Sequence, residues 1–101
     1  MIKIYPNTKV YIAAPAAAAT GGPELLHQLA FHLNNEGIKA YMYYYPSNHP
    51  NPIHPNYKEY NVQYVNEIED KKDNVFIVPE VFQGLELLEN YQYIRKTIWW
   101  L

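Results

Sequence analysis

Residues 10–24 read VYIAAPAAAATGGPE, and this stretch decides the fold. The apolar run at its start is typical of a buried strand, and the small residues that follow are typical of a loop. Pro23 is favoured at the start of a helix, because an N–H group there would have no partner within the helix. We therefore expect a strand over residues 9–14 and a helix that begins at Pro23, with Gly22 as its N-cap residue.

The residues that follow complete a strand–helix–strand unit. Apolar side chains recur at helical spacing from Pro23 to Glu36, and the pattern ends near Gly37, a residue typical of helix C-termini. The nearly continuous apolar and aromatic run over 38–45 predicts a second strand, parallel to the first. The whole unit has the length of one crossover connection.

The second half of the chain continues this alternation. In order, we expect a stiff proline-rich loop over 46–55, a turn or two of helix over 56–61, a short strand over 62–68, a strand over 75–78, a helix over 84–96 and a strand from residue 97. The pattern predicts an α/β sandwich with a mainly parallel sheet. Ligands of such sheets bind at the carboxyl ends of the strands, where residues 20–24 and Pro79-Glu80 are expected.

Length and composition set further limits. The 101 residues make one domain, and the formal net charge of −2 gives no electrostatic reason to expect a nucleic-acid partner. The chain contains no cysteine, which excludes disulfides and thiolate metal sites. Its first residues do not read as a signal peptide, and no apolar run approaches the roughly 18 residues of a membrane span. We therefore expect a cytoplasmic protein.

Several common kinds of site are not supported by the sequence. The dinucleotide and P-loop glycine patterns are missing, and Ser47 is the only serine and lies in no nucleophile-elbow motif. His49 and His54 share the proline-rich loop, but two histidines without a carboxylate make a poor zinc site, so we expect no metal. His27 and His32 fall on the polar flank of the expected helix and are predicted to be solvated.

Tyrosine is the unusual component of the composition. The chain has 11 tyrosines, and five of them lie close together in the sequence, at positions 41, 43, 44, 45 and 57. An amphipathic tyrosine suits stacking against sugars, but it is also a good strand residue. We favour the structural interpretation and leave the binding interpretation open.

Residues 21–41 resemble the amino-terminal start of GT-B glycosyltransferases. The shared pattern is Gly-Gly-x-Glu, then a helix of the form Leu-x-x-Leu-Ala-x-x-Leu, then Glu-Gly-Ile-Lys-Ala-Tyr. The remainder of the chain carries no motif of comparable specificity. The resemblance implies a Rossmann-like three-layer sandwich that faces a second such domain across a cleft. It also implies a nucleotide-sugar donor, a sugar or glycan acceptor bound mainly by the amino-terminal domain, and no required metal or other cofactor.

The resemblance also suggests site residues. Thr20, Gly21, Gly22 and Glu24 would lie near the donor phosphates or the acceptor hydroxyls, with backbone amides facing negative charge. Glu80 would be the catalytic acid or base, a role that a buried carboxylate at that place could fill. Simpler interpretations remain open: a tight turn for the two glycines, a partner of the helix dipole for Glu24, and a solvated strand end for Glu80.

The sequence ends in an apolar stretch that includes Trp99 and Trp100. We expect the 101 residues to form a single Rossmann-like domain, the incomplete half of a two-domain protein. The chain alone would be inactive without its carboxy-terminal domain, and it would self-associate through exposed apolar surface. The alternative is a noncatalytic flavodoxin-like module that binds a nucleotide or a sugar. A phosphoacceptor receiver domain is not supported, because the first strand ends without an acidic residue.

Overall fold

The computed structural model describes residues 4–16, 21–45, 52–53, 55–80 and 82–99. These residues form five strands, two α-helices and one 3₁₀-helix. In chain order these are β1 (Lys9–Pro15), α1 (Gly21–Asn35), β2 (Lys39–Tyr45), η1 (Pro55–Tyr60), β3 (Tyr64–Val65), β4 (Val75–Pro79), α2 (Phe82–Leu88) and β5 (Arg95–Trp99). The expected α/β class is therefore confirmed.

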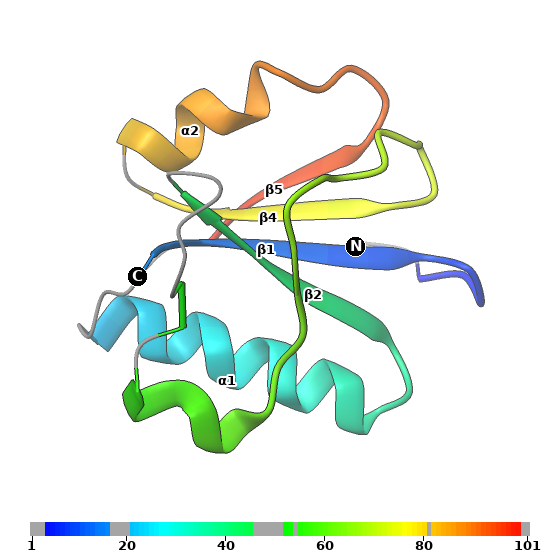
Figure 1. Cartoon of the computed structure of the whole chain (residues 1–101). Coiled ribbons are helices and arrows are strands. Elements are labelled where there is room, and N and C mark those ends of the chain that lie inside the picture. Colours follow the sequence, from blue (N-terminus) through cyan, green and yellow to red (C-terminus); the bar gives the residue numbers. More distant parts are fainter. Residues whose placement is uncertain (1–3, 17–20, 46–51, 54, 81, 100–101) are drawn as a thin grey trace.

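The five strands form one sheet in the order β3-β2-β1-β4-β5, and every pair of neighbours is parallel. The chain builds outward from β1 to β3, then returns to place β4 on the other side of β1 (Figure 1). This is the 3-2-1-4-5 order of Rossmann-like sheets, and it differs from the 2-1-3-4-5 order of flavodoxin-like sheets. The fold is a Rossmann-like sandwich.

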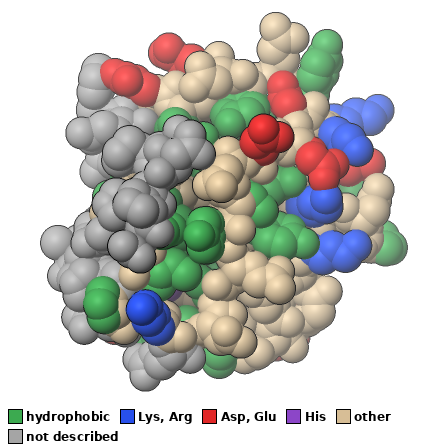
Figure 2. Space-filling view, in the orientation of Figure 1, with side chains coloured by type: hydrophobic (Ala, Val, Ile, Leu, Met, Phe, Trp, Pro, Cys, Tyr) green, Lys and Arg blue, Asp and Glu red, His purple; other side chains and the backbone are tan. Residues whose placement is uncertain are grey.

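Helices cover the two faces of the sheet unequally. The long helix α1 and η1 lie on one face, and the short helix α2 lies on the other (Figure 1). Side chains of β1 alternate between two cores: Val10 and Ile12 pack on the α1 face, and Tyr11 and Ala13 pack on the α2 face. Because α2 has only seven residues, it covers less of its face than α1 does. Figure 2 shows hydrophobic side chains exposed in the middle of the visible surface.

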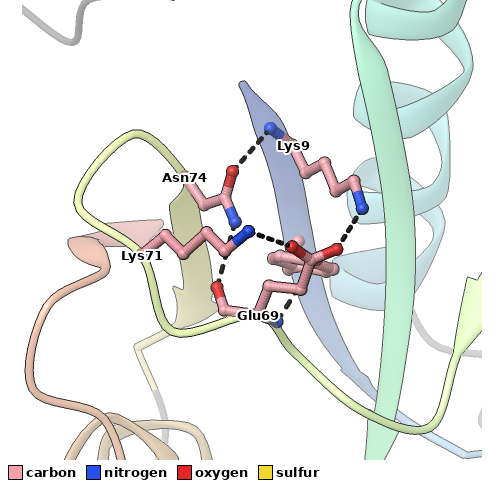
Figure 3. A network of polar contacts seen from close by, with 5 residues as sticks. Lys9, Glu69, Lys71 and Asn74 are labelled. Atoms are coloured by element: carbon pink, nitrogen blue, oxygen red, sulfur yellow. Dashed lines mark hydrogen bonds and ion pairs between the residues drawn. The ribbon is translucent and has the colours of Figure 1, made fainter. Parts of the chain in front are cut away.

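The connection from β3 to β4 (residues 66–74, the crossing segment) contains no helix. It is held by polar contacts near the amino ends of β1 and β4 (Figure 3). The buried Asn74 side chain accepts a hydrogen bond from the Lys9 N–H (3.0 Å) and donates one to the Glu69 carbonyl (3.0 Å). The Glu69 carboxylate pairs with the Lys9 and Lys71 ammonium groups. These bonds fasten the crossing segment to the central strand.

The second helix is shorter than the sequence predicts. We expected a helix over 84–96, whereas α2 ends at Leu88 and β5 begins at Arg95. The reason is Asp70, whose carboxylate accepts hydrogen bonds from the N–H groups of Gln92, Tyr93 and Ile94 at 2.8–2.9 Å. Amides bound in this way are not available for helical hydrogen bonds. The expected strand over 62–68 is likewise reduced to β3.

At the two ends of α1, one prediction is wrong and one is confirmed. The helix begins at Gly21, so Gly22 is its second residue and not its N-cap, and Pro23 still lies in the first turn. At the other end Gly37 has a φ of +83°, which favours glycine. Its N–H donates to the Asn34 carbonyl (3.1 Å), and the Ile38 N–H donates to the Leu33 carbonyl (3.0 Å). This pair of bonds is a Schellman motif, as the stop signal predicted.

Candidate functional site

Strands β1 and β4 are neighbours whose following helices lie on opposite faces of the sheet. In parallel sheets such a switch point leaves a crevice outside the carboxyl ends of the two strands, and this is where ligands bind. After β1 the chain leads to Gly21 and Gly22 at the start of α1, and after β4 it leads to Glu80. The topology thus brings both predicted site segments to the carboxyl edge of the sheet, where the strands end.

The start of α1 supplies backbone N–H groups that have no partner within the helix. Glu24 lies in this first turn and is exposed, and its carboxylate accepts a long hydrogen bond from the Tyr60 hydroxyl (3.5 Å). Gln28 donates to the same hydroxyl oxygen (3.1 Å), so η1 is tied to α1 beside Glu24. Thr20, the remaining predicted residue of this segment, lies outside the described residues.

Glu80 directly follows Pro79 at the carboxyl end of β4. The side chain is exposed, whereas we expected a catalytic carboxylate at this place to be buried. No hydrogen bond or ion pair joins it to the residues that the structure describes. An exposed carboxylate without a partner among the described residues can approach a ligand hydroxyl. The position of Glu80 therefore suits an acid or a base, whereas its exposure differs from the burial that we expected.

His27 is the residue that the sequence placed least well. We expected it to be solvated, but it is only 1% exposed and lies between β2 and η1. Its Nε2 atom is 2.7 Å from the Tyr44 hydroxyl, and its ring stacks on Tyr57 with centroids 4.5 Å apart. Burial raises the pKa of Tyr44 well above its ordinary value, which keeps the hydroxyl protonated. His32, by contrast, is exposed as expected.

The tyrosines of β2 alternate between the two faces of the sheet. Tyr41 and Tyr43 lie on the α2 face, where Tyr41 stacks on Tyr11 (6.0 Å) and Tyr43 packs edge-on against Phe76 (5.9 Å). Burial raises the pKa of Tyr91 to about 12, and the neighbouring Tyr43 hydroxyl, which hydrogen-bonds to it, adds to the shift. These two tyrosines of β2 therefore have structural partners, in line with the interpretation that we favoured.

Among the described residues, no group of three or more His, Cys, Asp or Glu side chains could hold a metal ion. His49 and His54 lie outside the described residues. Neither of the two described α-helices combines the length and the apolar character that crossing a membrane requires.

Comparisons of the chain with protein-family models, with curated proteins and with solved structures give no match. A function for this chain is therefore inferred from the sequence pattern, the strand order and the residues at the carboxyl edge of the sheet.

Proposed function

We propose that this chain is the acceptor-side, Rossmann-like domain of a GT-B glycosyltransferase. The enzyme would transfer a sugar from a nucleotide-sugar donor to a sugar or glycan acceptor. The observation that carries the proposal is the strand order, with the Gly21-Gly22 helix start and Glu80 following the two strands of the switch point. The resemblance of residues 21–41 to this class of enzyme gives the same assignment from the sequence.

Each segment has a distinct role in the proposed reaction. An acceptor oxygen bonds to the anomeric carbon of the donor as the bond from that carbon to the diphosphate oxygen breaks, and the electron pair leaves with the diphosphate. Backbone amides at Gly21 and Gly22 stabilise the charge that develops on the diphosphate. The acceptor proton passes to the Glu80 carboxylate. The nucleotide sugar is a substrate, and the proposal includes no further cofactor.

The proposal includes a second domain that holds the nucleotide sugar, so the 101-residue chain alone is expected to be inactive. It also predicts that the isolated chain self-associates through apolar surface that the second domain would cover. Ile98 of the edge strand β5 is 38% exposed and Tyr93 is 67% exposed. The side chains of Trp99 and Trp100, where we expected such surface, lie outside the described part. Light scattering that finds only monomer at high concentration would contradict this part.

A sugar-transfer assay tests the proposal. Nucleoside diphosphate release from UDP- and GDP-sugars is measured with methyl pyranosides as acceptors. The polypeptide encoded by the whole reading frame around these residues should turn over, and the 101-residue chain should not. In the active form, Glu80→Gln should lower turnover by about 10²- to 10⁴-fold. Glu89→Gln, a change of another exposed glutamate, is the matched control and should leave turnover unchanged.

Each result has a defined meaning. Transfer by the 101-residue chain alone would overturn the two-domain assignment. Full activity of Glu80→Gln would overturn the role of Glu80 and leave the assignment of the enzyme class intact. Sugar or nucleotide binding without transfer by either polypeptide would favour the noncatalytic binding module, although not with the flavodoxin-like strand order.

A further inference from the structure

Tyr45 is the last residue of β2 and lies at the carboxyl edge of the sheet. It is in register with Pro15 of β1, and its carbonyl accepts a hydrogen bond from the Ala16 N–H (2.9 Å). Its side chain is on the α2 face, as are those of Tyr41 and Tyr43. Because β1 alone separates β2 from β4, the Tyr45 backbone is roughly 10 Å from β4, twice the spacing between strands.

The three tyrosines on this face differ in how their side chains are used. Tyr41 stacks on Tyr11, and Tyr43 packs on Phe76 and hydrogen-bonds to Tyr91. Tyr45 is half-buried, yet no hydrogen bond or ring contact joins its side chain to any residue that the structure describes.

The environment of the Tyr45 hydroxyl supports the same contrast. Burial alone raises the pKa of Tyr45, so its hydroxyl is partly removed from water, and it has no hydrogen bond to the residues that the structure describes. A partly desolvated hydroxyl group gains free energy when a ligand supplies the missing hydrogen bond. Of the three β2 tyrosines on this face, Tyr45 is thus the one whose side chain has neither a hydrogen bond nor a ring contact among the described residues.

We propose that Tyr45 binds the acceptor sugar: its ring stacks against the C–H face of a pyranose, and its hydroxyl bonds to a sugar hydroxyl. This inference rests on the proposed function, because a sugar bound by Tyr45 beside the switch point would be the acceptor of the proposed reaction. A pyranose has one apolar face and a rim of hydroxyl groups, which matches an aromatic ring that carries one polar atom. Tyr45 would hold the acceptor between β2 and the catalytic residue Glu80.

The test measures pyranoside binding by the 101-residue chain, independently of sugar transfer. Backbone amide NMR spectra are recorded during titration with the methyl glycosides of glucose, galactose and mannose. At least one glycoside should shift the amides of Tyr45 and Ala16. Tyr45→Leu should weaken this binding about threefold to tenfold, because an aromatic face is lost. Tyr45→Phe keeps the ring and should weaken it less.

Tyr41→Leu is the matched control, since it makes the same chemical change on the same strand and face at the far end from the carboxyl edge. It should leave pyranoside affinity unchanged, and amide spectra of each variant report whether it is folded. Equal loss in Tyr41→Leu and Tyr45→Leu, or no glycoside that shifts the Ala16 amide, would overturn the inference. So would UDP binding that depends on Tyr45, because the ring would then serve the nucleotide.

The outcomes separate the two proposals. Pyranoside binding that depends on Tyr45, together with no transfer by the longer polypeptide, would retain the sugar site and overturn the glycosyltransferase assignment. Transfer that depends on Glu80 but is indifferent to Tyr45→Leu in its KM for the acceptor would retain the enzyme and overturn the role of Tyr45.

Discussion

Polar side chains differ in their partners between the amino edge of the sheet, where the strands begin, and its carboxyl edge, where the strands end. At the amino edge, the side chains of Glu69, Asp70 and Asn74 bond to backbone or charged groups that are distant in the sequence. In Figure 2 most of the visible charged side chains gather toward one side of the molecule. At the carboxyl edge, the Tyr45 and Glu80 side chains form no hydrogen bond or ion pair with the residues that the structure describes.

This difference determines what the polar groups at each edge contribute to stability. Buried polar groups need partners, and at the amino edge those partners come from the chain itself. A polar group that already has its partners contributes to the free energy of folding but has little left for a ligand. At the carboxyl edge, where ligands of parallel sheets bind, Glu24 accepts a long hydrogen bond from Tyr60, but Tyr45 and Glu80 have no such bond to the described residues. Substitutions at the two edges should therefore differ in their effect on stability.

The largest effect is expected from Asn74→Ala. Asn74 is 3% exposed, and its side chain joins β1 to the crossing segment through hydrogen bonds to Lys9 and Glu69. Alanine would leave the Lys9 N–H without its partner and would remove one of two hydrogen bonds to the Glu69 carbonyl, which also accepts from the Lys71 N–H (2.9 Å). The free energy of unfolding should therefore fall by about 2–4 kcal/mol. Urea denaturation measures the change. Asn66→Ala, at an exposed asparagine of the same crossing segment, should change it by less than about 0.5 kcal/mol.

Equal destabilisation by these two alanine substitutions would contradict the comparison. It would mean that the amino edge is not held by the particular bonds of Asn74, and that the crossing segment is fixed by packing alone.

A smaller loss is expected from Tyr44→Phe, which tests the buried part of the carboxyl half of β2. The change removes the hydroxyl that lies 2.7 Å from His27 Nε2 and keeps the ring. Because the pair is buried, the free energy of unfolding should fall by about 1–2 kcal/mol. Tyr64→Phe is the control, since Tyr64 is 44% exposed, and it should be nearly neutral. A neutral Tyr44→Phe would show that the bond to His27 contributes nothing to stability.

Asp70→Asn should have a still smaller effect, one that depends on pH. Three N–H donors, that of Gln92 first among them, hold the pKa of the Asp70 carboxyl below its ordinary value. Since the folded pKa is the lower one, the stabilisation is complete above about pH 4 and is lost as the pH falls through the folded value. The difference in urea midpoint between the parent and Asp70→Asn should therefore be larger at pH 7 than at pH 2.5.

Asp73→Asn provides the comparison, because the backbone carbonyl of Asp73, not its carboxylate, accepts the bond from Arg95. Its difference from the parent should be small at both pH values. A gap for Asp70→Asn that stays constant with pH would mean that the ionised carboxylate is not what holds residues 92–94.

Local sequence signals predicted the parts of the fold that depend on neighbours along the chain. Helix α1, its Gly37 stop and the strands β1, β2 and β4 follow from periodicity and turn chemistry. The errors arise where a distant residue decides the structure. Asp70 ends the expected second helix early from more than 20 positions away, and η1 buries His27 by bringing Tyr57 onto α1.

The candidate site shows the same limit. Gly21, Gly22 and Glu80 were expected at strand ends from the order of the elements along the chain. The strand order, which sets β1 beside β4, could not be read from the sequence, because it depends on how the elements pack in space. Nothing in the sequence distinguished Tyr45 from its neighbouring tyrosines, because only the packed structure shows which of them have partners among the described residues.

The smallest expected effect is that of Tyr45→Phe on stability, and it is the sharpest test of the comparison. Tyr44 and Tyr45 are consecutive residues of β2, and the same change removes one hydroxyl from each. Tyr44→Phe loses a buried hydrogen bond, whereas Tyr45→Phe loses none to the described residues, so its free energy of unfolding should stay within about 0.5 kcal/mol of the parent. Urea denaturation of both variants side by side measures the contrast. A loss at Tyr45 as large as that at Tyr44 would show that the fold itself uses this hydroxyl, and the carboxyl edge would then be no more available to a ligand than the amino edge.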